Sequence, residues 1–322
     1  MLGTEQLAAA NVFFWQWEVD LIAWIQSWMN PALVQVCSIV SMLGEELVPV
    51  AIFALIYFCI NKKMAKRIFV NFVAVNLTNP MIKNIALRKR PYMVHENIRC
   101  LKPIDKSADI MDISAQGYSF PSGHAVNSLT MMGSLAMYVK NHAVTVVSVV
   151  LVLLCGISRF CLGVHYPTDV IAGFLEGVIV ILLMELMERK IPNKWVRYLI
   201  IVLLAVPGWF FCRSNDFYVG FGMLLGFIPA EYVEEKYVNF TEAKNPLRAI
   251  VRVVIALGLF VGLNTVLKLP FSKELLASAT FAQYLIRTIR YALIVFLILG
   301  VYPFAFRFWD RKESLAKKAK SL

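Results

Sequence analysis

An all-α, polytopic transmembrane helical bundle is the fold class that this sequence predicts, and three observations support it. Of the 322 residues, 59% are hydrophobic and only 16% are charged. The mean hydropathy is +0.66, which is high for a soluble domain. Apolar segments of about 20 residues, the length that crosses a bilayer core as a helix, recur along most of the chain. We therefore expect a chain that spans the membrane several times.

The net charge of +11 raises the question of a nucleic-acid partner. The cations lie mainly at the ends of apolar segments, where membrane topology and anionic lipid headgroups account for them. No basic patch with interleaved aromatic residues stands apart, so we expect no nucleic-acid binding. The six cysteines have neither metal-ligand nor Cys-x-x-Cys spacing and are interpreted as packing residues.

The N-terminal region, residues 1–45, is expected to contain an amphipathic interfacial helix and a short apolar segment. Residues 1–11 have no basic segment and are interpreted as mature protein rather than a cleaved signal. Residues 12–30 carry four tryptophans among polar residues, which indicates an amphipathic helix at headgroup level: Trp15, Trp17, Trp24 and Trp28. The apolar run 32–43 fits either a short first span or a half-embedded helix.

Clearer spans follow along the rest of the chain. They are expected at about 46–61, 68–87, 123–140, 143–161, 169–188, 196–212, 217–233, 249–267 and 283–306. We divide this part into a core, residues 46–190, and a C-terminal transmembrane extension, residues 191–322, which ends in a basic tail. The long polar connection 88–120 is expected to be functional or disordered.

The distribution of Lys and Arg predicts an orientation in the membrane. One set of alternate connections is the more basic, and it comprises residues 62–67, 140, 189–197, 236–252 and the tail 307–320. The positive-inside rule places that set in the cytoplasm. The opposite set includes the connection 88–120 and the chain around residues 159–165, so these segments are expected on the extracytoplasmic side.

Three separated pieces of sequence on that side carry side chains that suit one phosphate group. They are Lys83 with Arg90-Pro91, then Pro121-Ser122-Gly123-His124, and then Ser158-Arg159 with His165 and Asp169. Phosphoryl transfer through a covalent intermediate needs a nucleophile, a proton donor for the leaving oxygen and fixed positive charge. These side chains could supply all three.

His165 and Asp169 are four residues apart, about one helical turn, and Pro167-Thr168 between them favours a helix start. Asp169 can then accept the Nδ1 proton of His165 and leave Nε2 free to attack phosphorus. His124 follows Ser122-Gly123 at an expected helix N-terminus, where free backbone N–H groups favour an anion. We interpret His124 as the general acid and base.

The remaining cations complete a cradle for the phosphate oxygens. Lys83 offers a point charge, and Arg90 and Arg159 offer planar forks. Arg88, Lys89 and Arg99 are expected instead to be solvated loop charges or to attract headgroups. Tyr118 and Tyr166 could shape a headgroup pocket or anchor the chain at the interface. His95 and His142 are interpreted as structural.

The pattern Lys83-x6-Arg90-Pro91, Pro121-Ser122-Gly123-His124 and Ser158-Arg159-x5-His165-x3-Asp169 resembles the signature of the type 2 phosphatidic acid phosphatase (PAP2) family. The resemblance covers about residues 40–190 and fills every signature position. It implies a six-helix transmembrane core and a metal-independent, cofactor-free phosphatase. By the same resemblance, His165 is the phosphorylated residue, Asp169 its partner and His124 the acid and base. Lys83, Arg90, Ser122, Gly123 and Arg159 are the implied phosphate binders.

The run from Asn215 to Glu231 resembles, more weakly, a motif of extended bacterial members. In it, Gly222-x3-Gly226 is interpreted as a site of close helix packing. Asp216 and Glu231 either lie at interfaces and packing contacts or line a headgroup or ion path. The bacterial likeness places the protein in a bacterial cytoplasmic membrane.

The expected substrate is a phosphomonoester or terminal diphosphate of a lipid, of the phosphatidic acid, phosphatidylglycerophosphate or polyprenyl diphosphate type. An acyl or prenyl chain could enter sideways from the bilayer between helices. The same site would also suit a soluble sugar phosphate or phosphate transfer between lipids. A lipid-phosphate binder or transporter is the non-enzymatic alternative, although it would not need a nucleophile with an orienting carboxylate. The sequence does not define an oligomeric state.

Overall fold

The structure, a computed structural model, describes residues 12–306 of the chain. The expectations for the N-terminal residues 1–11 and for the basic tail after residue 306 lie outside the described residues. Within the described range every element is a helix, apart from an isolated bridge residue at Arg88, which confirms the predicted all-α class. The chain divides into two compact units, one of residues 1–50 and 67–217 and the other of residues 51–66 and 218–322.

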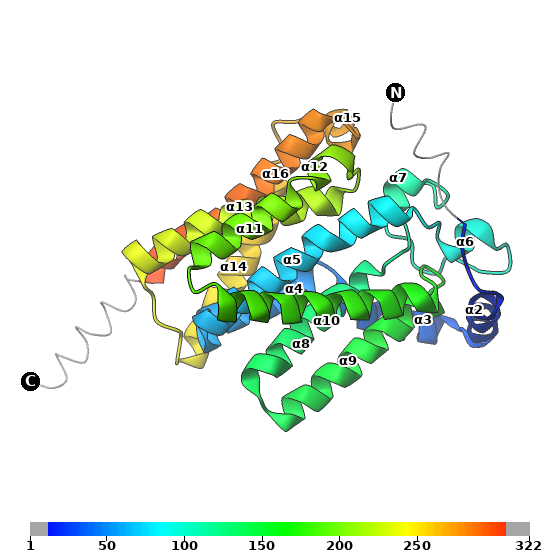
Figure 1. The fold of residues 1–322 in the computed structure, drawn as a ribbon, viewed down its shortest axis with the longest axis horizontal. Helices are drawn as coiled ribbons and strands as arrows, with labels where there is room; N and C mark the ends of the chain where they lie inside the picture. Colours follow the sequence, from blue (N-terminus) through cyan, green and yellow to red (C-terminus); the bar gives the residue numbers. More distant parts are fainter. Residues whose placement is uncertain (1–11, 307–322) are drawn as a thin grey trace, which may run out of the picture. The chain divides into compact units, whose positions relative to one another are not determined.

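The first unit contains the segments that the sequence pattern predicted to carry the chemistry (Figure 1). Its helices are α2 (Gln16–Trp28), α3 (Pro31–Ser41), the short α6 (Pro91–Val94) and α7 (Ile113–Gln116), α8 (Gly123–Val139), α9 (His142–Cys161), α10 (Pro167–Lys190), α11 (Lys194–Ala205) and α12 (Gly208–Phe211). Two further helices, α4 (Leu47–Leu55) and α5 (Lys62–Ala86), have residues in both units.

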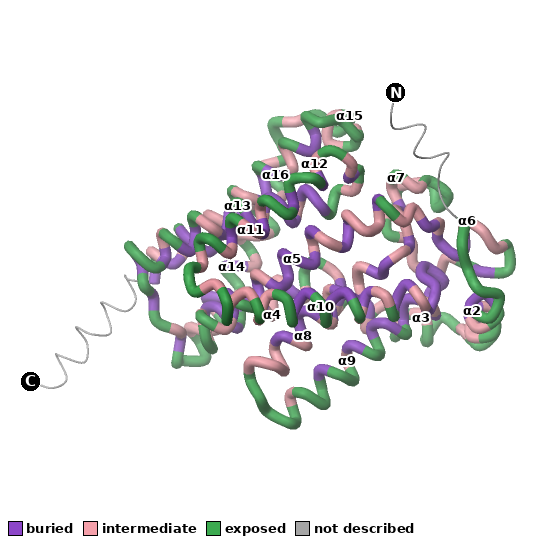
Figure 2. The backbone as a smooth tube through the Cα atoms, viewed as in Figure 1, coloured by how far each residue is buried: buried purple, intermediate pink, exposed green. Residues whose placement is uncertain are grey.

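Helices α8 and α9 form a hairpin, and α10 packs against α8 (Figure 1). Burial is concentrated where α5, α8 and α10 face one another (Figure 2). The start of α8 and the first turns of α10 approach closely at Gly173. A Cβ added there would lie only 2.7 Å from the carbonyl oxygen of Ser122, so glycine allows the contact. This packing brings the N-termini of α8 and α10 together.

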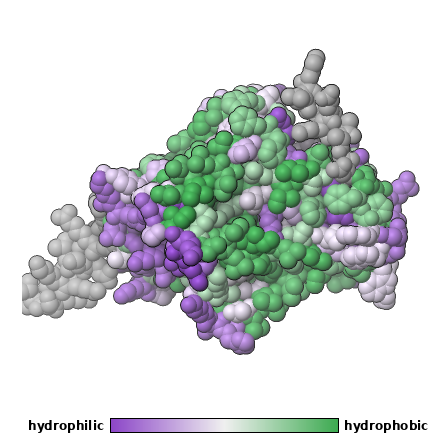
Figure 3. Space-filling view, in the orientation of Figure 1, coloured by the Kyte–Doolittle hydropathy of each residue, from purple (hydrophilic) through white to green (hydrophobic). Residues whose placement is uncertain are grey.

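The outward faces of α9 and α10 are apolar rather than polar. On α9 the exposed side chains include Val146, Val150, Leu153 and Ile157, and on α10 they include Ile171, Leu175, Leu182 and Leu186. Figure 3 shows apolar side chains over this part of the surface and hydrophilic ones at the α8–α9 turn. An exposed aliphatic face on a long helix is typical of contact with lipid tails.

Five helical segments of the described chain are long and apolar enough to cross a membrane. They are His142–Cys161, Pro167–Lys190, Lys194–Phe211, Pro246–Val266 and Phe281–Ala305. A sixth is added if the helices on either side of the break after Gly44 count as one broken span. The protein is therefore a multi-pass integral membrane protein, as predicted.

The second unit contains α13 (Asn215–Val233) after its first turn, α14 (Pro246–Val266), α15 (Lys273–Ala277) and α16 (Phe281–Phe296). The prediction that Gly222 and Gly226 serve close packing is confirmed. A Cβ on Gly226 would lie 2.2 Å from the carbonyl oxygen of Ala292 on α16, and one on Gly222 would lie 2.4 Å from that of Thr288. Glu231 is buried and lies 3.5 Å from the Lys66 ammonium, within an ion-pair cluster.

Candidate active site

The three predicted pieces of sequence meet in the first unit. Arg90 Nη1 lies 3.5 Å from His165 Nε2, and His165 Nδ1 lies 3.4 Å from Asp169 Oδ2. The backbone N–H of Ser122 donates to the carbonyl of Asp169 at 2.9 Å. These contacts join chain segments that are separated by up to 75 residues.

His165 stands in the short connection between α9 and α10. Gly163 gives that connection its sharp turn, because its φ of +75° is favourable only for glycine. The predicted helix start at Pro167 is confirmed, and Asp169 Oδ2 accepts the Tyr166 N–H at 2.8 Å as a cap. The imidazole of His165 is 1% exposed. At 3.4 Å the predicted hydrogen bond from His165 Nδ1 to Asp169 Oδ2 is not formed, and within the described residues Nδ1 has no hydrogen-bond partner. Catalytic hydrogen bonds are often this long before substrate binds.

Arg90 is held rigidly by backbone carbonyl groups on two segments. Its Nε donates to Gln116 O at 2.9 Å and to Gly117 O at 3.0 Å, and its Nη1 donates to Val164 O at 2.8 Å. The guanidinium therefore ties the 88–120 connection to the turn that carries His165. This also fixes a positive charge beside the Nε2 atom of that histidine.

The N-terminus of α8 forms another wall of the site. The helix begins at Gly123, as predicted, and the Ser122 hydroxyl caps it by accepting the Ala125 N–H at 3.5 Å. A Cβ on Gly123 would lie 3.5 Å from Lys83 Nζ, so the lysine ammonium stands directly over this helix end. His124 follows in the first turn, with a side chain that is 17% exposed. Free N–H groups and the ammonium together favour an anion here.

Arg159, near the end of α9, is a site cation with unused hydrogen-bonding capacity. Its side chain is 1% exposed, yet within the described residues its Nε and Nη1 atoms have no hydrogen-bond partner. A buried guanidinium with unsatisfied N–H groups is costly unless a ligand completes it. Two oxygens of a phosphate group match that need.

The site electrostatics keep His165 neutral. Burial is the largest cause that holds the pKa of His165 well below its ordinary value, and the positive charges of Arg90, Arg159 and Lys83 add to it. A neutral imidazole has a lone pair on one ring nitrogen and is able to act as a nucleophile.

Glu45, at the break between α3 and α4, is a site residue that the sequence pattern did not indicate. Its Oε1 lies 3.8 Å from His124 Nε2 and accepts a hydrogen bond from Lys102 Nζ at 2.5 Å. Contact with His124 is the largest cause that lowers the pKa of Glu45 to about 2, and Lys102 adds to it against the effect of burial. The carboxylate thus faces His124 as an anion. Gly44 allows the approach, because a Cβ there would lie 2.6 Å from the His124 backbone.

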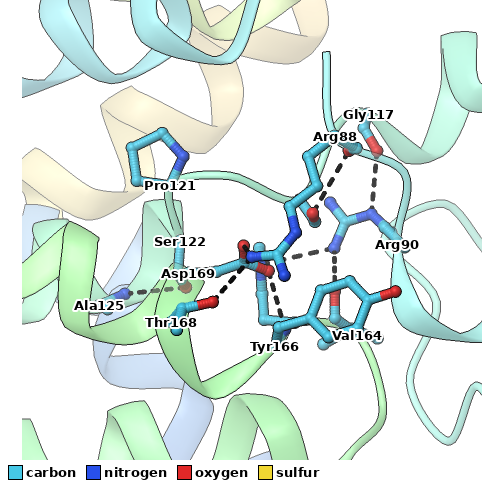
Figure 4. A network of polar contacts seen from close by, with 12 residues as sticks. Arg88, Arg90, Gly117, Pro121, Ser122, Ala125, Val164, Tyr166, Thr168 and Asp169 are labelled. Carbon is cyan, nitrogen blue, oxygen red and sulfur yellow. Dashed lines mark hydrogen bonds and ion pairs between the residues drawn. The ribbon is translucent and has the colours of Figure 1, made fainter. Parts of the chain in front are cut away.

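Arg88 corrects one expectation from the sequence. It was expected to be a solvated loop charge, but it is 1% exposed. Its Nη1 donates to Asp169 Oδ1 at 2.6 Å and to Thr168 Oγ1 at 2.8 Å (Figure 4). The ring of Tyr166 lies 4.0 Å from its guanidinium carbon. Arg88 therefore belongs to the support of the site, and Tyr166 packs beneath it.

Arg99 and His95, two other residues considered from the sequence, contact groups outside the phosphate cradle. Arg99 is exposed, as expected, and donates to the carbonyl of Gln26 at 2.8 Å. His95 contacts the Tyr166 hydroxyl at 3.1 Å. Between residues 12 and 306, no three His, Cys, Asp or Glu side chains are grouped so that they could hold a metal ion.

Fold and site together define a class: an integral-membrane helical bundle with a buried cationic cradle around two histidines. Comparison with protein families gives the same class a name. Residues 65–193 match the PAP2 superfamily, and residues 218–314 match the transmembrane extension of PAP2 superfamily phosphatases. The chain belongs to the PAP2 superfamily.

Three curated relatives are similar to parts of the chain. Phosphatidylglycerophosphatase B of Bacillus subtilis is 32% identical over 25% of this chain and 44% of its own length. An undecaprenyl-diphosphatase of Sulfolobus acidocaldarius is 26% identical over 49% of this chain and 71% of its own length. Undecaprenyl-diphosphatase BcrC of Bacillus subtilis is 30% identical over 34% of this chain and 49% of its own length. The chain thus spans about half, or less, of the two Bacillus proteins. No solved structure matches the chain.

Proposed function

We propose that the protein is a metal-independent lipid phosphate phosphatase that works through a phosphohistidine intermediate on the extracytoplasmic side of a bacterial membrane. The observation that carries the proposal is the unsatisfied guanidinium of Arg159, buried in the same site as the neutral His165. A phosphate group would satisfy the arginine and present its phosphorus to the imidazole.

In the first step, His165 Nε2 attacks phosphorus and the bond from phosphorus to the leaving oxygen breaks. Asp169, on the Nδ1 side, stabilises the positive charge that develops on the ring. The leaving alkoxide or phosphate takes a proton from His124, whose protonated form Glu45 stabilises from 3.8 Å against the opposing effects of burial and of Arg159. Lys83, Arg90 and Arg159 neutralise the non-bridging oxygens.

In the second step, the now neutral His124 takes a proton from water, and the water oxygen attacks phosphorus. The P–N bond breaks, its electron pair returns to His165, and inorganic phosphate leaves. His124 acts as the acid in the first step and as the base in the second, because hydrolysis reverses the proton transfer of the first step with water in place of the leaving group. All of the positive charge in the scheme comes from protein side chains.

A lipid substrate is favoured by the surface around the site. The exposed aliphatic faces of α9 and α10 end at Arg159 and Asp169, so a chain in the bilayer could lie along them while its phosphate enters the cradle. Two relatives bear the name of an undecaprenyl-diphosphatase and one that of a phosphatidylglycerophosphatase. These names favour a phosphomonoester or a terminal diphosphate of a lipid.

The extracytoplasmic location rests on the charge pattern. The basic turn between α8 and α9, with Lys140, lies at the opposite end of these helices from His124 and Arg159. The positive-inside rule puts the basic end in the cytoplasm. Activity of intact spheroplasts toward an added, membrane-impermeant phosphate ester would support this placement, whereas activity only after lysis would contradict it.

The decisive assay is phosphate release from a panel of lipid phosphates and diphosphates by the detergent-solubilised protein, with a metal chelator present. We expect turnover of at least one lipid, inhibition by orthovanadate and no activity in His165→Ala. His142→Ala, at the start of α9, is the matched control and should retain full activity. Preference for soluble sugar phosphates, or lipid flux into liposomes without phosphate release, would overturn the proposal.

A further inference from the structure

Helix α2 has two faces of opposite character. One face exposes Trp17, Trp24 and Trp28, and Trp15 is exposed at the N-cap; the exposed fractions of these four residues lie between 49% and 69%. The other face buries Glu18, Val19, Ile22 and Gln26. Glu18 has no exposed surface, although a buried carboxylate is costly unless it is paired.

Glu18 accepts hydrogen bonds from Arg88 and Thr168, the two residues on either side of the Asp169 carboxylate. Its Oε2 accepts from Arg88 Nη2 at 3.0 Å, and its Oε1 accepts from the Thr168 backbone N–H at 3.1 Å and the Thr168 hydroxyl at 2.5 Å. Arg88 uses its other end nitrogen on Asp169, at 2.6 Å. One guanidinium therefore bridges two buried carboxylates, one from α2 and one from α10.

Arg88 is fixed in this bridging position on all sides. Its Nε donates to the carbonyl of Phe13 at 2.8 Å, and its guanidinium carbon lies 4.5 Å from the Phe13 ring and 4.0 Å from the Tyr166 ring. These ring contacts and the hydrogen bond of Nε favour one orientation of the planar guanidinium, with one end nitrogen on each carboxylate. Its charge is consequently shared between Glu18 and Asp169.

We propose that Glu18 is a positioning residue that acts through Arg88 on Asp169, and so sets how much of the Asp169 charge is available to His165. The cluster of two carboxylates and one guanidinium carries a net charge of −1, which matches the single positive charge that His165 gains when it is phosphorylated. Without Glu18, Arg88 would neutralise Asp169 alone, and His165 would lose its counter-charge. This inference rests on the proposed role of His165 as the nucleophile.

The experiment compares the pH dependence of kcat/KM among purified full-length variants. In Glu18→Gln, the loss of an anion near His165 disfavours protonation of its imidazole, so the acidic limb moves to lower pH. In Arg88→Met, the loss of a cation moves the limb to higher pH. Each shift is roughly half a pH unit or more, as expected for one charge near a titrating histidine. Substrate ionisation is common to all variants and cancels in the comparison.

Two further measurements separate positioning from support of the fold. We expect Glu18→Gln to lower kcat by about tenfold with little change in KM, because the phosphate cradle is untouched. Gln26→Leu is the matched control on the same buried face. Its Nε2 donates to Arg99 O at 2.9 Å and its side chain carries no charge, so its loss should lower thermal stability without moving the acidic limb.

If Arg88→Met leaves two carboxylates too close to fold, the double variant Glu18→Gln/Arg88→Met removes one charge of each sign. Its acidic limb should lie close to that of the wild type. An unchanged limb and kcat in Glu18→Gln, or shifts of the same sign in the two single variants, would overturn the proposal. Activity in His165→Ala would instead refute the proposed function, so the two failures are distinguishable.

Discussion

Replacement of Arg159 by Met should make the protein less active without making it less stable. Methionine keeps a long unbranched side chain in the same space and removes the charge and the N–H groups. The structure gives Nε and Nη1 of Arg159 as buried and unsatisfied. We assign both groups to phosphate oxygens in the complex.

The two effects can be sized separately. A hydrogen bond to a charged group contributes about 1.5–3 kcal/mol, so two of them are about 3–6 kcal/mol, or roughly 10²–10⁴ in kcat/KM. In the free protein, each unsatisfied buried group costs about 1–3 kcal/mol, and the Met variant relieves that cost. We therefore expect Arg159→Met to unfold at a temperature no lower than the wild type.

The assay combines phosphate release with thermal unfolding in detergent, each with and without orthovanadate. Vanadate at about 100 times its Kd should stabilise the wild type by about 2.7 kcal/mol and should not stabilise Arg159→Met. Arg189→Met is the matched control, because the Arg189 side chain is 73% exposed at the far end of α10. The reasoning would be refuted if Arg159→Met were less stable than the wild type and kept more than about a tenth of the wild-type kcat/KM. A tenfold loss corresponds to only about 1.4 kcal/mol, which is less than the roughly 3–6 kcal/mol expected for two lost hydrogen bonds.

Three further predictions follow from the described contacts. Because the pKa of His165 is lowered, its neutral form persists as pH falls. The acidic limb of kcat/KM, corrected for substrate ionisation, should therefore lie below about pH 6.5, and a limb above that value would contradict the nucleophilic role of His165. Glu45→Gln should lower kcat about tenfold for alkyl phosphates but little for aryl phosphates, whose leaving group needs no proton; an equal loss for both would remove Glu45 from the proton-transfer step. Gly226→Val forces a Cβ to 2.2 Å from a carbonyl oxygen of α16 and should destabilise the protein by about 1–3 kcal/mol, whereas a Cβ in Gly258→Val meets nothing within 4 Å and should cost less. Thermal unfolding compares the two variants, and equal losses of stability would contradict the packing account.

The sequence predicted the fold class and the eight motif residues because these depend on local patterns. Apolar length predicts membrane helices, and a Pro or Ser before a helix start predicts where α8 and α10 begin. Alternation of the spans then placed His124, His165 and Asp169 at the same end of the bundle. Each step used only neighbouring residues and the two ends of a helix.

The supporting residues could not be predicted in the same way. Glu18 and Glu45 reach the site through tertiary packing of α2 and of the α3–α4 break, and neither belongs to a motif with fixed spacing. Arg88 did carry a signal, since it stands two residues before Arg90 in extended backbone, where alternate residues can share a face. Its partner Glu18 is 70 residues away, so burial of the pair was not visible locally.

The most direct test of the account is to trap the phosphoenzyme. With an aryl phosphate, His124→Ala should still form the P–N bond but hydrolyse it slowly, because no base activates water. Rapid quenching under alkaline conditions and mass spectrometry of the peptides should find phosphate on the peptide that contains His165, and none in His124→Ala/His165→Ala. Full turnover in His165→Ala, or phosphate bound to another residue, would contradict the central claim.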